Sequence, residues 1–151
     1  MRNTLSASLA LAGLLCAAPL LAQQGSPNST PMGVTRVVLV RILPNESAAF
    51  WQDVRQHLKP IYDEEKRQGM IQDWGISTKT TIDSENDWSV AMTFTYKNWA
   101  ALDDFAARTD PITLAHYGTA AKRTDANNAR ATHGRIVQSF LVRGQTVNDW
   151  K

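Results

Sequence analysis

Cysteine is almost absent from this sequence: the 151 residues contain one, Cys16. That residue lies in an N-terminal stretch that we expect to be removed, so the mature protein would contain no cysteine. Disulfide bonds and thiol chemistry are thereby excluded from the mature chain. Its stability must come from packing, with oligomerisation as a second source.

Short catalytic motifs are also missing. The sequence contains no GxSxG, no P-loop and no GxGxxG. The three histidines, His57, His116 and His133, form no i, i+4 pair and no HExxH. Metal-binding residues in a sequence usually show such spacings. We therefore predict no metal site and no cofactor.

Charge of one sign is not concentrated anywhere along the chain. Sixteen Lys and Arg residues are interleaved with fourteen Asp and Glu residues, for a net charge of +2. Binding to a phosphate backbone requires a basic stripe or patch. The sequence thus argues against nucleic acid as a partner.

The first 22 residues have the composition of a secretory signal peptide. Arg2 precedes an apolar run from Leu5 to Ala22, and a polar segment follows abruptly. An uncleaved membrane anchor is the alternative, but Pro19 and the many alanines favour cleavage. A lipoprotein at Cys16 is disfavoured by Leu15, where a small residue is required. We expect export to the periplasm or the outside, with no membrane attachment after cleavage.

The remaining chain divides into three parts. Residues 23–33 are rich in Gln, Ser, Pro and Asn and are predicted to form a flexible leader. Residues 34–144 suffice for one domain with a modest core. Residues 145–151 are predicted to be a polar C-terminal tail.

Residues 88–96 carry the clearest pattern in the sequence. Large apolar residues at the even positions alternate with small or hydroxylic residues at the odd positions. This period of two predicts a strand. We expect the even-numbered face, Trp88 to Tyr96, to pack beneath helices or to line a cavity.

Other elements follow from local patterns. Strands are predicted over 34–43, 70–80 and 134–143, and a helix over 46–68 that Pro60 should kink. The charged run 63–68 reads as a solvated helix end, with Gly69 as the residue after the C-cap. A second helix starts after Asn98, a third starts at Pro111, and 126–132 reads as a loop.

The resulting order is β-α-β-β-α-(α)-β, which predicts an α+β, ferredoxin-like fold. An antiparallel four-stranded sheet would carry its helices on one face only. The other face keeps apolar residues such as Val37, Val137 and Leu141, and an apolar face requires a cover. We predict a homodimer formed through this open sheet face.

The chain resembles the dimeric α/β-barrel superfamily, in which two ferredoxin-like protomers join their sheets. Three pieces carry the resemblance: Leu58-Lys59-Pro60-Ile61-Tyr62, then Gly69-Met70-Ile71, then Trp74. They are similar to a pattern found in small secreted bacterial proteins of that type. The superfamily includes cofactor-independent monooxygenases and isomerases of small aromatic compounds, but no catalytic set of that superfamily maps onto this chain.

Candidate site residues are aromatic and histidine side chains. Those predicted to line an apolar ligand pocket are Trp51, Tyr62, Trp74, Trp88 and Phe94. The catalytic candidates are His116, Tyr117 and His57, although each is also typical of a core or helix-surface residue. We expect binding of a small apolar or aromatic molecule, or a structural role; the alternative is a cofactor-independent monooxygenase or isomerase.

Overall fold

A computed structural model describes residues 29–84 and 86–147. The predicted signal peptide, residues 1–22, lies outside the described residues, as does most of the predicted leader. No helix in the part of the chain that the structure describes is long and apolar enough to cross a membrane. Export and signal cleavage therefore stay predictions.

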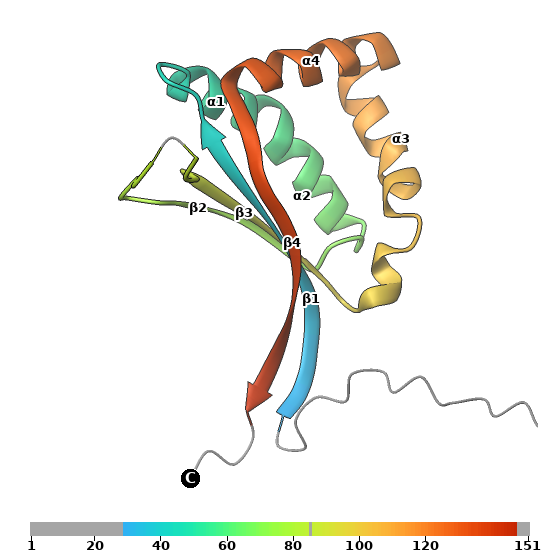
Figure 1. The fold of residues 1–151 in the computed structure, drawn as a ribbon. Helices are drawn as coiled ribbons and strands as arrows, with labels where there is room; N and C mark the ends of the chain where they lie inside the picture. Colours follow the sequence, from blue (N-terminus) through green and yellow to red (C-terminus); the bar gives the residue numbers. More distant parts are fainter. Residues whose placement is uncertain (1–28, 85, 148–151) are drawn as a thin grey trace, which may run out of the picture.

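Four strands form one antiparallel sheet (Figure 1). They are β1 (Ser29–Ile42), β2 (Asp73–Thr78), β3 (Val90–Tyr96) and β4 (Gly134–Val147), in the spatial order β2-β3-β1-β4. All three neighbouring pairs are antiparallel. The predicted α+β, ferredoxin-like arrangement is confirmed.

The helices cover one side of this sheet (Figure 1). A long first helix consists of α1 (Ser47–Asp53), the π-helical turn η1 (Val54–Leu58) and α2 (Lys59–Arg67). After β3 come the 3₁₀ turn η2 (Trp99–Leu102), α3 (Phe105–Tyr117) and α4 (Ala120–His133). Asn98 caps η2 as predicted, since its side chain accepts a hydrogen bond from the Ala101 N–H.

Strand β3 has the predicted alternation. Its buried residues are Val90, Met92, Phe94 and Tyr96, all at most 7% exposed, and the residues between them are only partly buried. The even face of β3 thus packs beneath the helices. Trp88 precedes the strand and is partly buried, with the Lys79 ammonium 5.5 Å from its ring centre.

The first helix continues through Pro60 because it widens just before that residue. The N–H of Lys59 donates to the carbonyl of Val54, five residues back. A regular helix would press the Pro60 ring against the carbonyl four residues earlier, and a π-helical turn relieves this crowding. Pro60 therefore falls in the first turn of α2, where proline is tolerated.

Strands β1 and β4 are longer than predicted, since β1 begins at Ser29 and β4 ends at Val147. Residues 29–31 pair with residues 145–147, whereas β3 pairs with β1 only from Val34 onward. The two strands thus leave the sheet as a two-stranded arm (Figure 1). Backbone pairing between β1 and β4 extends along the arm, and an apolar pattern cannot reveal such pairing.

Two helical predictions also need correction. Residues 105–117 form one helix with Pro111 inside it, so no new helix starts at Pro111. Residues 126–132 belong to α4 and are not a loop. The alanines at positions 120, 121, 126, 129 and 131 favour helix strongly, but they make no apolar stripe from which a helix could be recognised.

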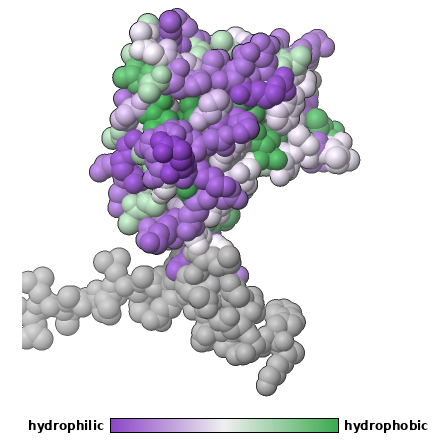
Figure 2. All heavy atoms as spheres, turned by 180° about the vertical axis from the view of Figure 1, so that it is seen from behind, coloured by the Kyte–Doolittle hydropathy of each residue, from purple (hydrophilic) through white to green (hydrophobic). Residues whose placement is uncertain are grey.

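The side of the sheet away from the helices carries an apolar patch on β1 and β4. Residues that face each other across antiparallel strands share a face, which places Thr35, Val37 and Leu39 of β1 on this outer side with Phe140 and Val142 of β4. Phe140 is 37% exposed and Val142 is 41% exposed. Elsewhere hydrophilic side chains predominate, with hydrophobic ones in separate patches on the face in Figure 2.

Candidate functional site

A cavity of about 530 Å³ lies between the sheet and the helices. Its lining comes from β1, β3, the first helix, α3, α4 and the start of β4. Most of the wall is apolar: Val38, Val40, Phe50, Leu58, Met92, Phe94, Phe105, Ala131 and Ile136. The polar lining residues are Arg36, Tyr62, Glu65, Tyr96, Asn127 and Arg130. A few polar groups on an apolar wall are typical of a small-molecule site.

Glu65 is the most unusual of these residues. It is only 4% exposed, and its carboxylate has no hydrogen-bond or ion-pair partner among residues 29–84 and 86–147. Burial raises the pKa of Glu65 from 4.5 to about 7, and no neighbouring cation offsets this effect. The side chain is therefore half protonated near neutral pH.

The end of α2 fixes the backbone of Glu65. Gly69 has the left-handed φ of 73°, its N–H donates to the Lys66 carbonyl at 3.0 Å, and the Met70 N–H donates to the Glu65 carbonyl at 2.9 Å. These two bonds define a Schellman motif. Gly69 ends the helix as predicted, but the expected solvation of 63–68 is wrong for Glu65.

Two tyrosine hydroxyls lie in the electrostatic field of Glu65. Burial is the largest effect on both, and it raises the pKa of Tyr62 to about 12 and also raises the pKa of Tyr96. The charges of Glu65 and Arg36 act on both phenols in opposite directions. Both tyrosines therefore stay protonated and can donate hydrogen bonds at any physiological pH.

Arg36 lies on the helix-covered face of β1, opposite Phe94. Its Nε donates to the Ser139 hydroxyl at 3.2 Å, and a hydrogen bond from Arg36 also acts on Tyr96. Within the described ranges, no carboxylate forms an ion pair with it. Its positive charge is thus available to an anionic group in the cavity.

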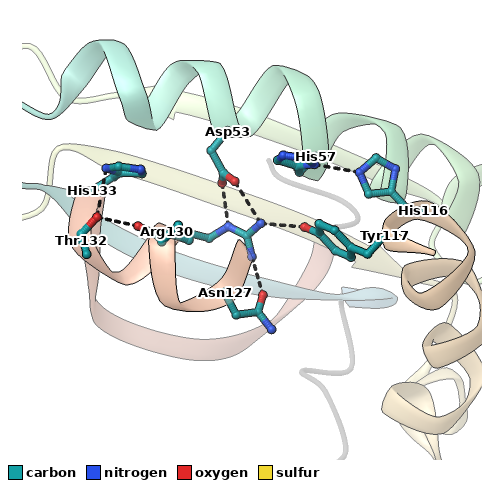
Figure 3. Close-up of polar contacts among 9 residues, drawn as sticks. Asp53, His57, His116, Tyr117, Asn127, Arg130, Thr132 and His133 are labelled. Atoms are coloured by element: carbon teal, nitrogen blue, oxygen red, sulfur yellow. Dashed lines mark hydrogen bonds and ion pairs between the residues drawn. The ribbon is translucent and has the colours of Figure 1, made fainter. Parts of the chain in front are cut away.

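Arg130 is held by a network that joins three helices (Figure 3). Its Nε and Nη2 donate to the two carboxylate oxygens of Asp53 at 2.6 and 3.2 Å. The Tyr117 hydroxyl accepts from Nη2 at 2.9 Å, and the Asn127 side-chain oxygen accepts from Nη1 at 2.9 Å. Asp53 neutralises the Arg130 charge, so this residue forms a rigid wall of the cavity.

His57 and His116 form a pair beside that network (Figure 3). His57 Nδ1 and His116 Nε2 are 3.0 Å apart, and both rings pack against Tyr117. One nitrogen must donate and the other accept, which requires at least one neutral ring. Burial, then the charges of His57 and Arg130, lowers the pKa of His116.

Of the predicted pocket residues, Tyr62 and Phe94 line the cavity. Trp51 and Trp74 pack at the margin of the core instead, and Trp88 lies beside Lys79. The indole N–H of Trp74 donates to Asp63 at 3.0 Å. The cavity is therefore not filled by the tryptophans that were expected to surround it.

The predicted catalytic candidates come together, but outside the cavity lining. His57, His116 and Tyr117 contact one another beside the Arg130 guanidinium (Figure 3). His116 lines a second, smaller pocket between α2 and α3, with Ile61 and Ile112. Of these three residues, Tyr117 is linked to the main cavity, because its hydroxyl accepts a hydrogen bond from Arg130, which lines the cavity. His133 binds Glu46 at 2.8 Å.

The sequence analysis missed Glu65, Arg36 and Arg130. Glu65 follows Leu58 by seven residues and Ile61 by four, which is the spacing of a buried helical stripe. That spacing was the available signal. Arg36 alternates with Val34 and Val38 on one strand face, but nothing local marks Arg130, which α4 carries among polar residues.

Among the described residues, no group of three or more His, Cys, Asp or Glu side chains lies close enough together to hold a metal ion.

Comparisons with known proteins give similarity of fold only. No protein-family model matches the chain, and no curated protein matches it. Among solved structures, HapK from Hahella chejuensis is 11% identical, with a TM-score of 0.43 over 72% of this chain and 90% of that one. At this identity, neither a ligand nor an activity transfers to this chain.

Two further solved structures are described as ferredoxin-like and dimeric. A protein of unknown function from Bacteroides fragilis is 11% identical, with a TM-score of 0.41 over 75% of this chain and 95% of its own. A protein from an uncultured marine organism is 11% identical, with a TM-score of 0.44 over 81% and 93%.

Proposed function

We propose that this protein binds a small, largely apolar organic molecule, aromatic or alicyclic, that carries one polar or anionic group. The cavity beneath the helices is the binding site. Its volume of about 530 Å³ lies within the range of ligand pockets, which is about 300 to 1,000 Å³. A purely structural protein has no need of such a cavity, because its core would be close-packed.

The Arg36 guanidinium is the observation that supports a polar or anionic group on the ligand. Its guanidinium borders the apolar wall formed by Val38 and Phe94, and no carboxylate of the described chain neutralises it. Arginine binds carboxylates and other planar anions through two parallel hydrogen bonds. The polar group of the ligand would therefore lie at Arg36 and its apolar body against β3.

We also propose that the protein is exported and works as a homodimer. The composition of residues 1–22 supports export. The apolar outer face of the sheet supports a second copy as its cover, because residues such as Val37 and Phe140 would otherwise remain in water. That face lies on the opposite side of the sheet from the cavity, so each copy would keep its own site.

A thermal-shift screen of the exported, purified protein tests ligand binding. Aromatic and alicyclic carboxylic acids are compared with the alcohols of the same size. We expect some acids to raise the melting temperature and the matched alcohols to do so less. At a hundredfold excess over the dissociation constant, the gain in unfolding free energy is about 2.7 kcal/mol.

Two matched variants locate the site. Ala131→Trp fills the cavity from α4, whereas Ala121→Trp puts the same side chain on an exposed part of that helix that does not line the cavity. We expect the first to abolish the shift and the second to keep it. A wild-type protein that no acid stabilises, or equal binding by both variants, would contradict the proposal.

A further inference from the structure

We propose that Glu65 is a proton-transfer residue and that the cavity isomerises a small carbonyl compound by moving a proton between two of its carbon atoms. This rests on the proposed function, since the compound must first bind in the cavity. The inference comes from where Glu65 lies, what surrounds it and what holds it in place.

In the part of the chain that the structure describes, no ion pair or hydrogen bond compensates the burial of the Glu65 carboxylate. A buried carboxylate normally forms an ion pair or accepts several hydrogen bonds. Glu65 is 4% exposed, has neither among the described residues, and lines the cavity. Its neighbours in sequence, Glu64 and Lys66, pair instead with Arg67 and Asp73 at the surface. The chain thus keeps one unpaired acid facing an apolar space.

The surroundings of Glu65 suit a general base. A carboxylate stripped of water takes up protons more readily, and its raised pKa of about 7 matches the pH at which it would work. The charged and titratable groups that line the cavity with Glu65 are Tyr62 on α2, Tyr96 on β3, Arg36 on β1 and Arg130 on α4. Glu65 is the one carboxylate among these lining groups, and its pKa of about 7 lets it accept a proton near neutral pH.

Arg36 and the two phenols supply the complementary group. When a proton leaves a carbon beside a carbonyl, negative charge develops on the carbonyl oxygen. Arg36, with Tyr62 and Tyr96 as protonated donors, can stabilise that charge within a largely apolar wall. Neither Arg36 nor Arg130 pairs with Glu65, so the carboxylate is available as the base while Arg36 faces the developing charge.

The proposed reaction balances without a cofactor or an oxidant. The compound must carry a carbon–carbon double bond next to the reacting carbon, and the Glu65 carboxylate takes the proton of the C–H bond that lies between this double bond and the carbonyl. The electron pair of that bond becomes the carbon–carbon double bond of an enolate, and the carbonyl electron pair moves to its oxygen. The Glu65 carboxylic acid then returns the proton to the far end of the conjugated system, which moves the double bond and restores the carbonyl.

Glu65 also has the rigid support that a base requires. The Met70 N–H holds its carbonyl at 2.9 Å, and Ile61 packs one turn before it, 5% exposed. Together with the π turn, these contacts direct the side chain inward from the last turn of α2. A base must lie within hydrogen-bond reach of the proton that it removes.

The test uses 5-nitrobenzisoxazole, a small planar compound whose C–H proton a carboxylate removes. The electrons of that bond form the nitrile, the N–O bond breaks, and the nitrophenolate released is coloured. We expect the full exported protein to accelerate this reaction, with a rate that rises through about pH 7. Glu65→Gln should lower the rate by about 100-fold or more.

Glu64→Gln is the matched control, because Glu64 is a surface neighbour that pairs with Arg67. It should leave the rate unchanged. Binding of the probe is measured separately, by thermal shift, for the wild type and for Glu65→Gln. A purely structural role of Glu65 would change stability but would produce no rate with a midpoint near pH 7.

The outcomes separate the two proposals. If the probe binds and its turnover depends on Glu65, proton transfer is supported. If the probe binds equally to both proteins but turnover is absent or unaffected by Glu65→Gln, proton transfer is wrong and ligand binding stands. If neither the probe nor the acids of the screen bind, both proposals fall.

Discussion

Arg130 binds both carboxylate oxygens of Asp53, a residue 77 positions away in the sequence. The Asp53 side chain is 11% exposed and the Arg130 side chain is 25% exposed. This pair joins the last helix to the first, and Arg130 also lines the cavity (Figure 3). A mostly buried ion pair of this kind is sensitive to the loss of one partner, because the other is left without compensation.

Replacing Asp53 by Asn should therefore destabilise the fold. We expect a loss of about 2 kcal/mol in the free energy of unfolding, because Arg130 loses a charged acceptor. Urea denaturation at pH 7 measures it. Lys66→Ala is the control: its pair with Asp73 is well exposed, and exposed pairs contribute about 0.5 kcal/mol or less. Equal losses in the two variants would show that the buried pair has no special role.

Glu65 should make the protein less stable at alkaline pH. Its folded pKa, about 7, lies above its ordinary value of 4.5. The unfolded chain thus gives up this proton first, and stability falls as the pH rises from about 4.5 to about 7. Glu65→Gln should remove this dependence. At pH 8 it should be more stable than wild type by about 2 kcal/mol, a value that allows for water in the cavity.

The comparison must be made between the two proteins at each pH, since His116 acts in the opposite direction. Its lowered folded pKa removes stability as the pH falls below about 6.5. Both proteins share that loss, so their difference isolates Glu65. Stability curves that run parallel from pH 5 to pH 8 would show that Glu65 is not perturbed.

Gly33 should not tolerate a side chain. A Cβ at this position would lie 2.4 Å from the backbone oxygen of Tyr96, at the point where β1 and β3 meet. Gly33→Ala must push the two strands apart, at a cost of about 1 to 3 kcal/mol. Gly75→Ala is the comparison, because its Cβ would meet only the Thr93 hydroxyl at 3.3 Å. Thermal unfolding should rank Gly33→Ala as the less stable variant.

A charged side chain on the outer sheet face should prevent a second copy from binding there. Phe140 lies on that face opposite Val37 and is 37% exposed. We expect light scattering to give twice the monomer mass for the exported wild type and the monomer mass for Phe140→Lys. Gln56→Lys, on the exposed helix surface, should leave the mass unchanged. A monomeric wild type would show that the outer face is left uncovered.

The fold was predictable from the sequence because periodicity reports which face of an element is buried. The alternation from Val90 to Tyr96 and the apolar stripe of the first helix were enough to order the elements. Helix α4 was not predictable from Ala126 to Thr132, because none of its residues is buried and no apolar stripe exists. The arm before Val34 is seen in the backbone pairing of β1 with β4, which no apolar period reports.

The site was predictable only in part. Tyr62 and Phe94 follow from the same periodicity as the core, so apolar spacing finds them. Glu65 lies in a run of charges whose composition indicates solvent, and only its spacing from Leu58 and Ile61 indicates burial. The contact between Arg130 and Asp53 depends on how α4 crosses α1, which no local pattern encodes.

The widened turn ahead of Pro60 has a consequence for how related chains must be aligned. A π turn adds the equivalent of one residue to a helix, and each residue rotates the helix by about 100°. In a relative whose helix is regular here, the residue one position earlier in the chain would point in the direction in which Glu65 points. In an ungapped sequence alignment, the corresponding acid of such a relative would be one column away from Glu65. A single gap in the relative's sequence before Pro60 would align the two acids.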